Sequence, residues 1–247
     1  MNERYSLPTV PTAYTLVAVV GFVVFEAIYF AGYYGSQEKT VFSVALYSFN
    51  LAVIASSVVL LLWEYRRAGN MVVLLPCLAV LSWFLGILFY TSYVFMLGEI
   101  LLYPSVAQFA FHGFHLVMVP LLFHLMRSHG VSFWRPSALP VAGAALLPVV
   151  TYFLRTPGIT VVLYNVFYLS ITVLAFVLAA HLVYHRELPL FGGALLLFLS
   201  ADVIFITTTL VKRDPLIFFL HPFWFTASAL IGFSVVRYSR LGELPTS

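Results

Sequence analysis

Four ionisable side chains lie deep inside apolar runs of this sequence, where such groups are rare. Glu26 and Asp202 are the acids placed well inside these runs, and His112 and His115 lie near the middle of another run. An ionisable group at bilayer depth costs about 3 kcal/mol or more, so each is a candidate functional residue. We therefore take Asp202, His115 and Glu26 as candidate catalytic residues. The alternative for each is a structural hydrogen bond to a neighbouring helix or to a backbone carbonyl.

The two histidines are spaced for one side of a helix, because residues three apart share a face. We expect His112 and His115 at a depth similar to that of Asp202. A His–Asp pair can orient a base or relay a proton, and a protonated carboxyl can act as a general acid. Gly113 lies between the histidines and would let another helix approach closely. The pattern predicts a polar site near the middle of the chain's apolar body.

Further polar side chains within apolar runs are candidate ligand-binding residues: His112, Ser200, Asn165 and Asn50. Ser200 precedes Asp202 by two positions, which places the two side chains on different faces of a helix, so we do not expect them to act together. Asn50 and Asn165 carry amides whose simplest role at such depth is a hydrogen bond between helices.

A second group of histidines lies at the ends of two apolar runs: His124, His129, His181 and His185. Such a group can bind zinc or another divalent metal, or supply haem ligands from two facing helices. The competing interpretation is a set of interfacial histidines beside water and lipid headgroups, because no acid or cysteine completes the ligand set. The single cysteine, Cys77, excludes an internal disulfide and a cysteine-based metal cluster. No cofactor is required by the catalytic hypothesis.

The elements that position these residues are predicted to be membrane-spanning helices. The chain is 62% apolar and 9% charged, whereas a soluble domain carries about a quarter charged residues. The runs are apolar on every face, unlike the alternating strands of a membrane barrel. We therefore predict one all-α transmembrane domain over residues 1–247, a polytopic bundle of about eight helices. The predicted spans lie near 13–33, 41–63, 71–96, 101–126, 139–154, 159–184, 189–211 and 215–237.

Basic residues orient this bundle. Eight fall on the side shared by both termini: Arg4, Arg66, Arg67, Arg127, Arg135, Arg186, Arg237 and Arg240. Four fall on the other side: Lys39, Arg155, Lys212 and Arg213. The asymmetry predicts cytoplasmic termini. We also expect residence in the inner membrane of a bacterium. The basic residues form no stripe, so we expect membrane lipids and not nucleic acid as partners; the sequence leaves open a homo-oligomer or a signalling partner.

Two segments near the end of the chain resemble a known family. The seventh run reads G-A-L-L-L-F-L-S-A-D from Gly193 to Asp202, and the last run reads F-T-A-S-A-L-I-G-F-S from Phe225 to Ser234. Both resemble the lysoplasmalogenase (YhhN-like) family of eight-helix membrane proteins, and His115 matches a histidine of its fourth span. The resemblance implies hydrolysis of the vinyl-ether bond of lysoplasmalogens. The chain departs from the family at Ile87, where the family has an acid, and at Ala201, an insertion that rotates Asp202 by about 100°.

Three functions are compatible with these residues. The first is a hydrolase of ether-type lysolipids, in which Asp202 is the general acid and His115 or Glu26 orients water. The second is a non-catalytic sensor of a lipid or small ligand, since the stretch from Val236 to Pro245 also resembles the exit of seven-helix input modules of histidine kinases. The third is an electron carrier with histidine-ligated haem or a quinone.

Overall fold

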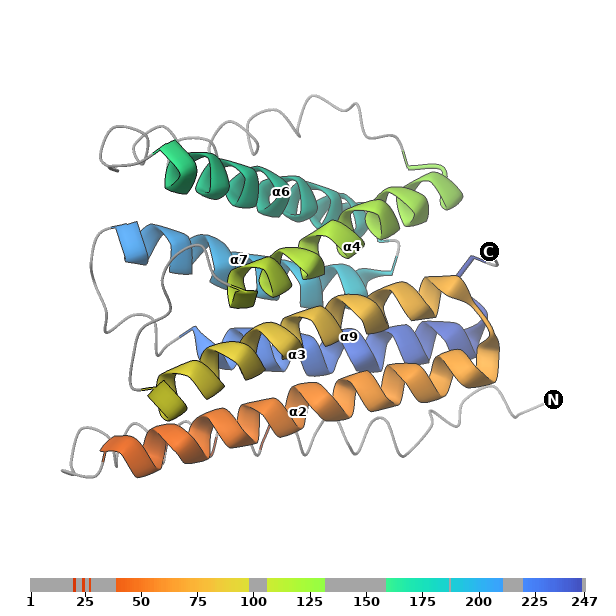
Figure 1. Ribbon diagram of the computed structural model, residues 1–247. Coiled ribbons are helices and arrows are strands. Elements are labelled where there is room, and N and C mark those ends of the chain that lie inside the picture. Colours follow the sequence, from red (N-terminus) through yellow and green to blue (C-terminus); the bar gives the residue numbers. More distant parts are fainter. Residues whose placement is uncertain are drawn as a thin grey trace.

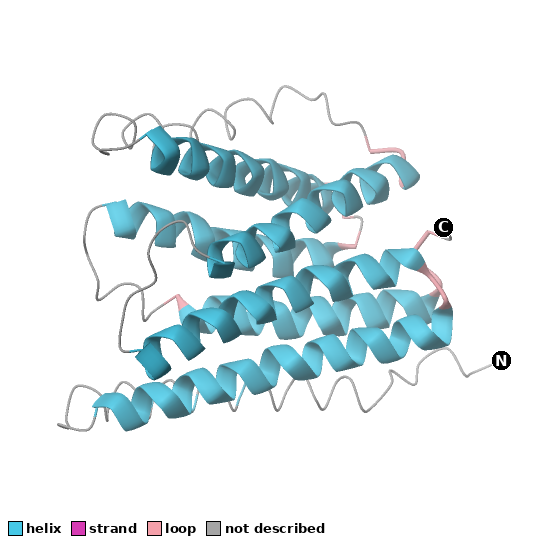
Figure 2. Cartoon of the chain, in the orientation of Figure 1, coloured by secondary structure: helices cyan, strands magenta, loops and turns pink. Residues whose placement is uncertain are grey.

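The computed structural model shows a bundle of α-helices (Figures 1 and 2). It describes residues 20, 24, 27, 39–97, 106–131, 159–186, 188–210 and 220–245. The helices are α2 (Lys39–Ala68), α3 (Met71–Leu97), α4 (Val106–Ser128), α6 (Ile159–Tyr184), α7 (Pro189–Leu210) and α9 (His221–Leu241). The all-α prediction is therefore confirmed for the residues described. The predicted span at 139–154, nearly all of that at 13–33, and with it Glu26, lie outside the described residues.

Four segments are long and apolar enough to cross a membrane among the residues described: Tyr47–Ala68, Met71–Tyr93, Val106–Ser128 and Val166–Tyr184. A shorter apolar helix covers Pro189–Phe205. A span needs about 20 apolar residues, because a helix rises 1.5 Å per residue through a hydrocarbon core of about 30 Å. The chain is therefore an integral membrane protein built as a helical bundle.

The helices pack in two groups that meet at α3, α4, α7 and α9. In one group α2 packs against both α3 and α9; in the other, α6 packs against both α4 and α7. Contacts of α3 with α4 and of α7 with α9 join the groups (Figure 1). The arrangement encloses side chains of α4, α6, α7 and α9 between neighbouring helices, and His112, His115 and Asp202 lie there.

Arginines gather at one end of this bundle. Helices α2, α4 and α9 all end on the same side (Figure 1). Their last turns carry Arg66 and Arg67, Arg127, and Arg240 respectively. Positive side chains favour the negative end of the helix dipole, and α9 closes there with Gly242 in the left-handed conformation (φ 71°), which donates to the carbonyls of Tyr238 and Ser239.

The second predicted span ends near residue 63, before Glu64, and this end is placed too early. Helix α2 continues to Ala68, and the Glu64 side chain is fully buried. The physical reason is that Arg67, one turn along the same helix, supplies a counter-charge for the carboxylate.

Helices α3 and α4 approach closely because Gly113 has no side chain, as the sequence predicts. A Cβ at this position would overlap the hydroxyl oxygen of Ser82. That hydroxyl donates a 2.7 Å hydrogen bond to the carbonyl of Ala110. The same interface is tight at Gly86, where a Cβ would overlap the ring of Phe111. The register of α4, and hence the depth of His112 and His115, depends on these contacts.

We expect Gly113→Ala to destabilise the protein by about 1–3 kcal/mol, because the new methyl group overpacks the α3–α4 interface. The measurement is unfolding by sodium dodecyl sulfate in mixed micelles, followed by tryptophan fluorescence. Ser82→Ala in the same chain should recover part of the loss, since it removes the overlapping oxygen. Gly193→Ala is the control, because no atom lies near that position. Equal effects of Gly113→Ala and Gly193→Ala would contradict the close approach.

Candidate functional site

Asp202 is fully buried on α7 and receives contacts from three other helices. Its Oδ1 accepts a 2.7 Å hydrogen bond from Nε1 of Trp224 on α9, and its Oδ2 accepts a 3.1 Å hydrogen bond from the hydroxyl of Tyr168 on α6. Nε2 of His115 on α4 lies 2.9 Å from Oδ2. We call these four residues the Asp202 centre. The structure thus brings Asp202 and His115 together, at the shared depth that their positions in the sequence predict.

Large aromatic rings surround the Asp202 centre. Phe198 lies one turn before Asp202 on α7 and stacks on Phe114 of α4, with ring centroids 4.1 Å apart. Trp83 of α3 contacts Phe198 at 4.6 Å and Trp224 at 5.7 Å. These rings exclude water from the carboxylate, so each of its polar contacts acts in a medium of low dielectric, where electrostatic interactions are stronger.

His115 approaches Asp202 through Nε2. Its Nδ1 lies 3.2 Å from the carbonyl oxygen of Phe111, which can only accept, so Nδ1 carries a hydrogen. The ring geometry does not aim an Nε2 hydrogen directly at Oδ2, so the 2.9 Å approach is a close electrostatic contact and not a well-aligned hydrogen bond.

His112 lies beside this centre and not in contact with the carboxylate. Its Nδ1 is 2.6 Å from the carbonyl oxygen of Gln108 and 2.8 Å from the hydroxyl of Tyr164. Its ring packs on Tyr168, with centroids 4.5 Å apart. Its Nε2 is buried and has no hydrogen-bond partner within the described ranges. Tyr168 therefore contacts both groups: its ring packs on His112 and its hydroxyl donates to Asp202.

Two other predicted ligand-binding residues, Ser200 and Asn50, form no hydrogen bond with the Asp202 centre among the described residues. Ser200 is half-buried and is not among the side chains that contact Asp202, as its position on the helix predicts. Asn50 is fully buried on α2, and both of its amide atoms lack a hydrogen-bond partner in the part of the chain that is described. Asn165 lies in α6, and its side chain is outside the described residues.

The second group of histidines shows local contacts. His124 is exposed, and Nδ1 of His129 lies 2.8 Å from the carbonyl oxygen of Leu125. Nδ1 of His181 lies 2.8 Å from the carbonyl oxygen of Val177, and the rings of His181 and His185 stack with centroids 6.3 Å apart. Among the residues described, no group of three histidine, cysteine or acidic side chains is placed to hold a metal ion.

Sequence reasoning missed Tyr168 and Trp224. Aromatic residues make up 17% of the chain, so neither residue stands out by type. Trp224 could have been inferred from the sequence, because the indole N–H of a buried tryptophan needs a hydrogen-bond acceptor. The mid-span Asp202 is an acceptor of the required kind. Tyr168 lies one helical turn after Tyr164, which contacts His112, so the two hydroxyls share a face of α6.

No protein-family model, curated protein or solved structure matches this chain.

We expect Tyr168→Phe to lower the free energy of unfolding by about 1–3 kcal/mol, because it removes a hydrogen-bond donor from a buried carboxyl. In the background of Asp202→Asn the same substitution should cost less, since the carboxyl acceptor has been replaced by an amide. Unfolding in mixed micelles measures both. The control is Tyr184→Phe, at a side chain 74% exposed, with an expected change within about 0.5 kcal/mol. Equal losses in the two backgrounds would show that the Tyr168 hydroxyl does not stabilise the fold through Asp202.

Proposed function

We propose that this protein is a polytopic membrane hydrolase of ether-type lysolipids, in which Asp202 is the general acid. The observation that carries the proposal is the 2.9 Å contact between His115 and Asp202, fully buried among apolar helices. A carboxyl and an imidazole that share one proton can hold it where bulk water is absent. The proposal includes eight helices, cytoplasmic termini and residence in a bacterial inner membrane. The resemblance of the stretch from Gly193 to Asp202 to the lysoplasmalogenase family supports the substrate class.

Each contact has a role in this chemistry. The carboxyl of Asp202 protonates the alkene carbon of a vinyl ether, which leaves a cation stabilised by the ether oxygen. Water adds to the neighbouring carbon, which is bonded to the ether oxygen, and gives a proton to the imidazole of His115. The resulting hemiacetal breaks into an aldehyde and the glycerol hydroxyl. His115 then returns the proton to Asp202. The hydrogen bonds from Trp224 and Tyr168 stabilise the carboxylate that forms during the first step.

The complete burial of the Asp202 centre favours a second function, that of a non-catalytic sensor of lipids. Asp202 and His115 are both 0% exposed, and each carboxylate oxygen already has a donor. An acid catalyst must meet its substrate, so in the hydrolase a lysolipid has to displace part of the aromatic wall. A non-catalytic sensor of lipids needs no such contact with the carboxylate. In a sensor, a ligand between α6 and its neighbours would shift the helices that meet at Asp202.

The hydrolase is tested with a lysolipid that carries a 1-alkenyl chain, and the released aldehyde is measured. We expect turnover by the parent protein and a loss of about 10²–10⁴-fold in Asp202→Asn, because the amide cannot donate the proton. The 1-alkyl lysolipid is the substrate control, since it has no alkene carbon to protonate. Tyr184→Phe is the protein control and should match the parent. Absence of aldehyde from the parent, or an Asp202→Asn variant as fast as the parent, would rule out the hydrolase.

The sensor is tested by thermal unfolding with the same two lysolipids. A sensor that ignores the alkene should be stabilised equally by the 1-alkenyl and 1-alkyl compounds, without any aldehyde formed. Tyr168→Phe should reduce that stabilisation because it loosens the α6–α7 contact, whereas Tyr184→Phe should not. Failure of both lysolipids to raise the unfolding midpoint would exclude a lysolipid sensor.

A further inference from the structure

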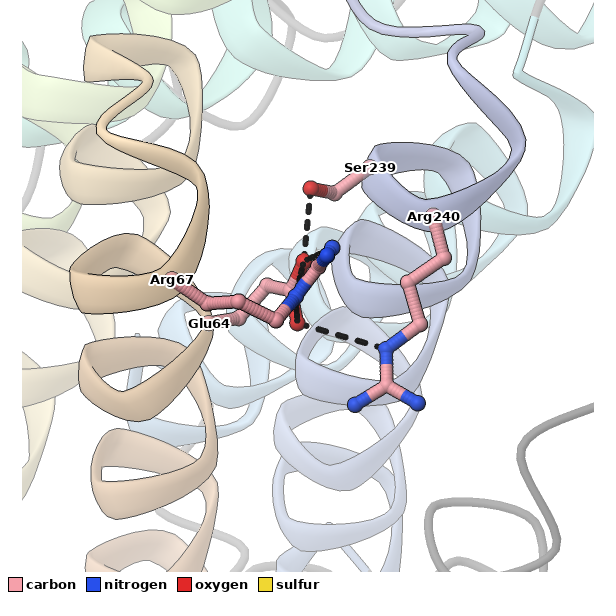
Figure 3. A network of polar contacts seen from close by, with 4 residues as sticks. All are labelled: Glu64, Arg67, Ser239 and Arg240. Carbon is pink, nitrogen blue, oxygen red and sulfur yellow. Dashed lines mark hydrogen bonds and ion pairs between the residues drawn. The ribbon is translucent and has the colours of Figure 1, made fainter.

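A second buried carboxylate joins α2 to α9 at the arginine-rich end of the bundle. Glu64 is fully buried and accepts hydrogen bonds from Arg67 to both of its oxygens (Figure 3). Ser239 donates to Oε1 at 2.8 Å, and Nε of Arg240 donates to Oε2 at 3.3 Å. We call these four residues the Glu64 cluster. Two guanidinium groups face one carboxylate, so the cluster carries a net charge of about +1.

Both arginines of the cluster keep donors for another partner. The Arg67 side chain is 47% exposed and that of Arg240 is 24% exposed. Arg240 uses only its Nε toward Glu64, and its two terminal nitrogens point away from the carboxylate (Figure 3). A guanidinium presents five donors in a planar fork that matches the oxygens of a phosphate. Glu64 therefore orients the two forks and leaves part of each open.

The surroundings of the cluster place it at the depth of lipid headgroups. Helix α2 is apolar enough to span the membrane from Tyr47 to Ala68, so Glu64 and Arg67 lie in its last turn and a half. Ser239 and Arg240 lie in the last turn of α9. Trp63 is 51% exposed, and the guanidinium carbon of Arg240 lies 5.1 Å from its ring centroid. Exposed tryptophans at helix ends are typical of the membrane interface. Arg66 is also exposed next to the cluster.

We propose that Arg67 and Arg240 bind the headgroup of an anionic phospholipid. The phosphate oxygens accept from the open nitrogens of the two guanidinium groups, and the acyl chains lie along the apolar outer face of α2. Guanidinium groups form charge-assisted pairs with phosphate, and an anionic leaflet concentrates such headgroups near arginines at the surface. The site is separate from the Asp202 centre, so it stands or fails independently of the proposed hydrolysis.

The test is thermal unfolding in neutral detergent with added phosphatidylglycerol, phosphatidylcholine or inorganic phosphate. We expect phosphatidylglycerol to raise the unfolding midpoint of the parent by about 2 °C or more, and the other two to have smaller effects. The double variant Glu64→Gln/Arg240→Gln keeps the net charge, strands no carboxylate and removes one guanidinium. It should lose most of the response to phosphatidylglycerol.

Two further variants keep the test decisive if that double variant does not fold. Arg240→Lys keeps the charge but not the planar fork, and should also weaken the response. Arg127→Gln removes an arginine at the same end of the bundle, outside the cluster, and should respond as the parent does. An equal response in Arg240→Lys and the parent, or an equal shift with inorganic phosphate alone, would overturn the proposal.

Discussion

The cost of placing a carboxylate away from water governs this structure. Asp202 lies inside a membrane bundle, where an unpartnered charge would be costly enough to compromise folding. Its two oxygens accept hydrogen bonds from side chains of α6 and α9, and His115 of α4 lies against one of them. Because no one of these helices can supply the contacts alone, their packing around α7 and the burial of Asp202 depend on each other.

The ionisable residues of the site could be predicted from the sequence, because the cost of burying such groups makes them rare in apolar runs. Asp202 and His115 stand out because ionisable groups are rare in apolar runs, and the spacing of His112, Gly113 and His115 on one helix placed the histidines correctly. Tyr168 and Trp224 could not be identified in the same way. Their role depends on how α6 and α9 are rotated about their axes, and the apolar pattern of these spans is too uniform to show which face points inward.

The same limit explains the error at Glu64. The four residues from Glu64 to Arg67 include three charged side chains and resemble a polar connection. The apolar run before them is already long enough to span a membrane, so its length gives no reason to extend the helix. The burial of Glu64 depends on Arg240 and Ser239, which lie 176 and 175 positions along the chain. Only the packing of α2 against α9 brings them together, so the helical fold was predictable whereas this pairing was not.

Helix α9 is held near both of its ends. Trp224, in its first turn, donates to Asp202, while Ser239 and Arg240, in its last, donate to Glu64; the hydroxyl of Tyr238 also accepts from the backbone nitrogen of Leu190. Because these hydrogen bonds lie near opposite ends of α9, the helix cannot shift along its axis or rotate about it without breaking at least one of them. Among the described helices, α6 packs chiefly against α4 and α7, whereas α9 packs against α2, α3 and α7. Opening of the proposed site would therefore displace α6 more readily than α9.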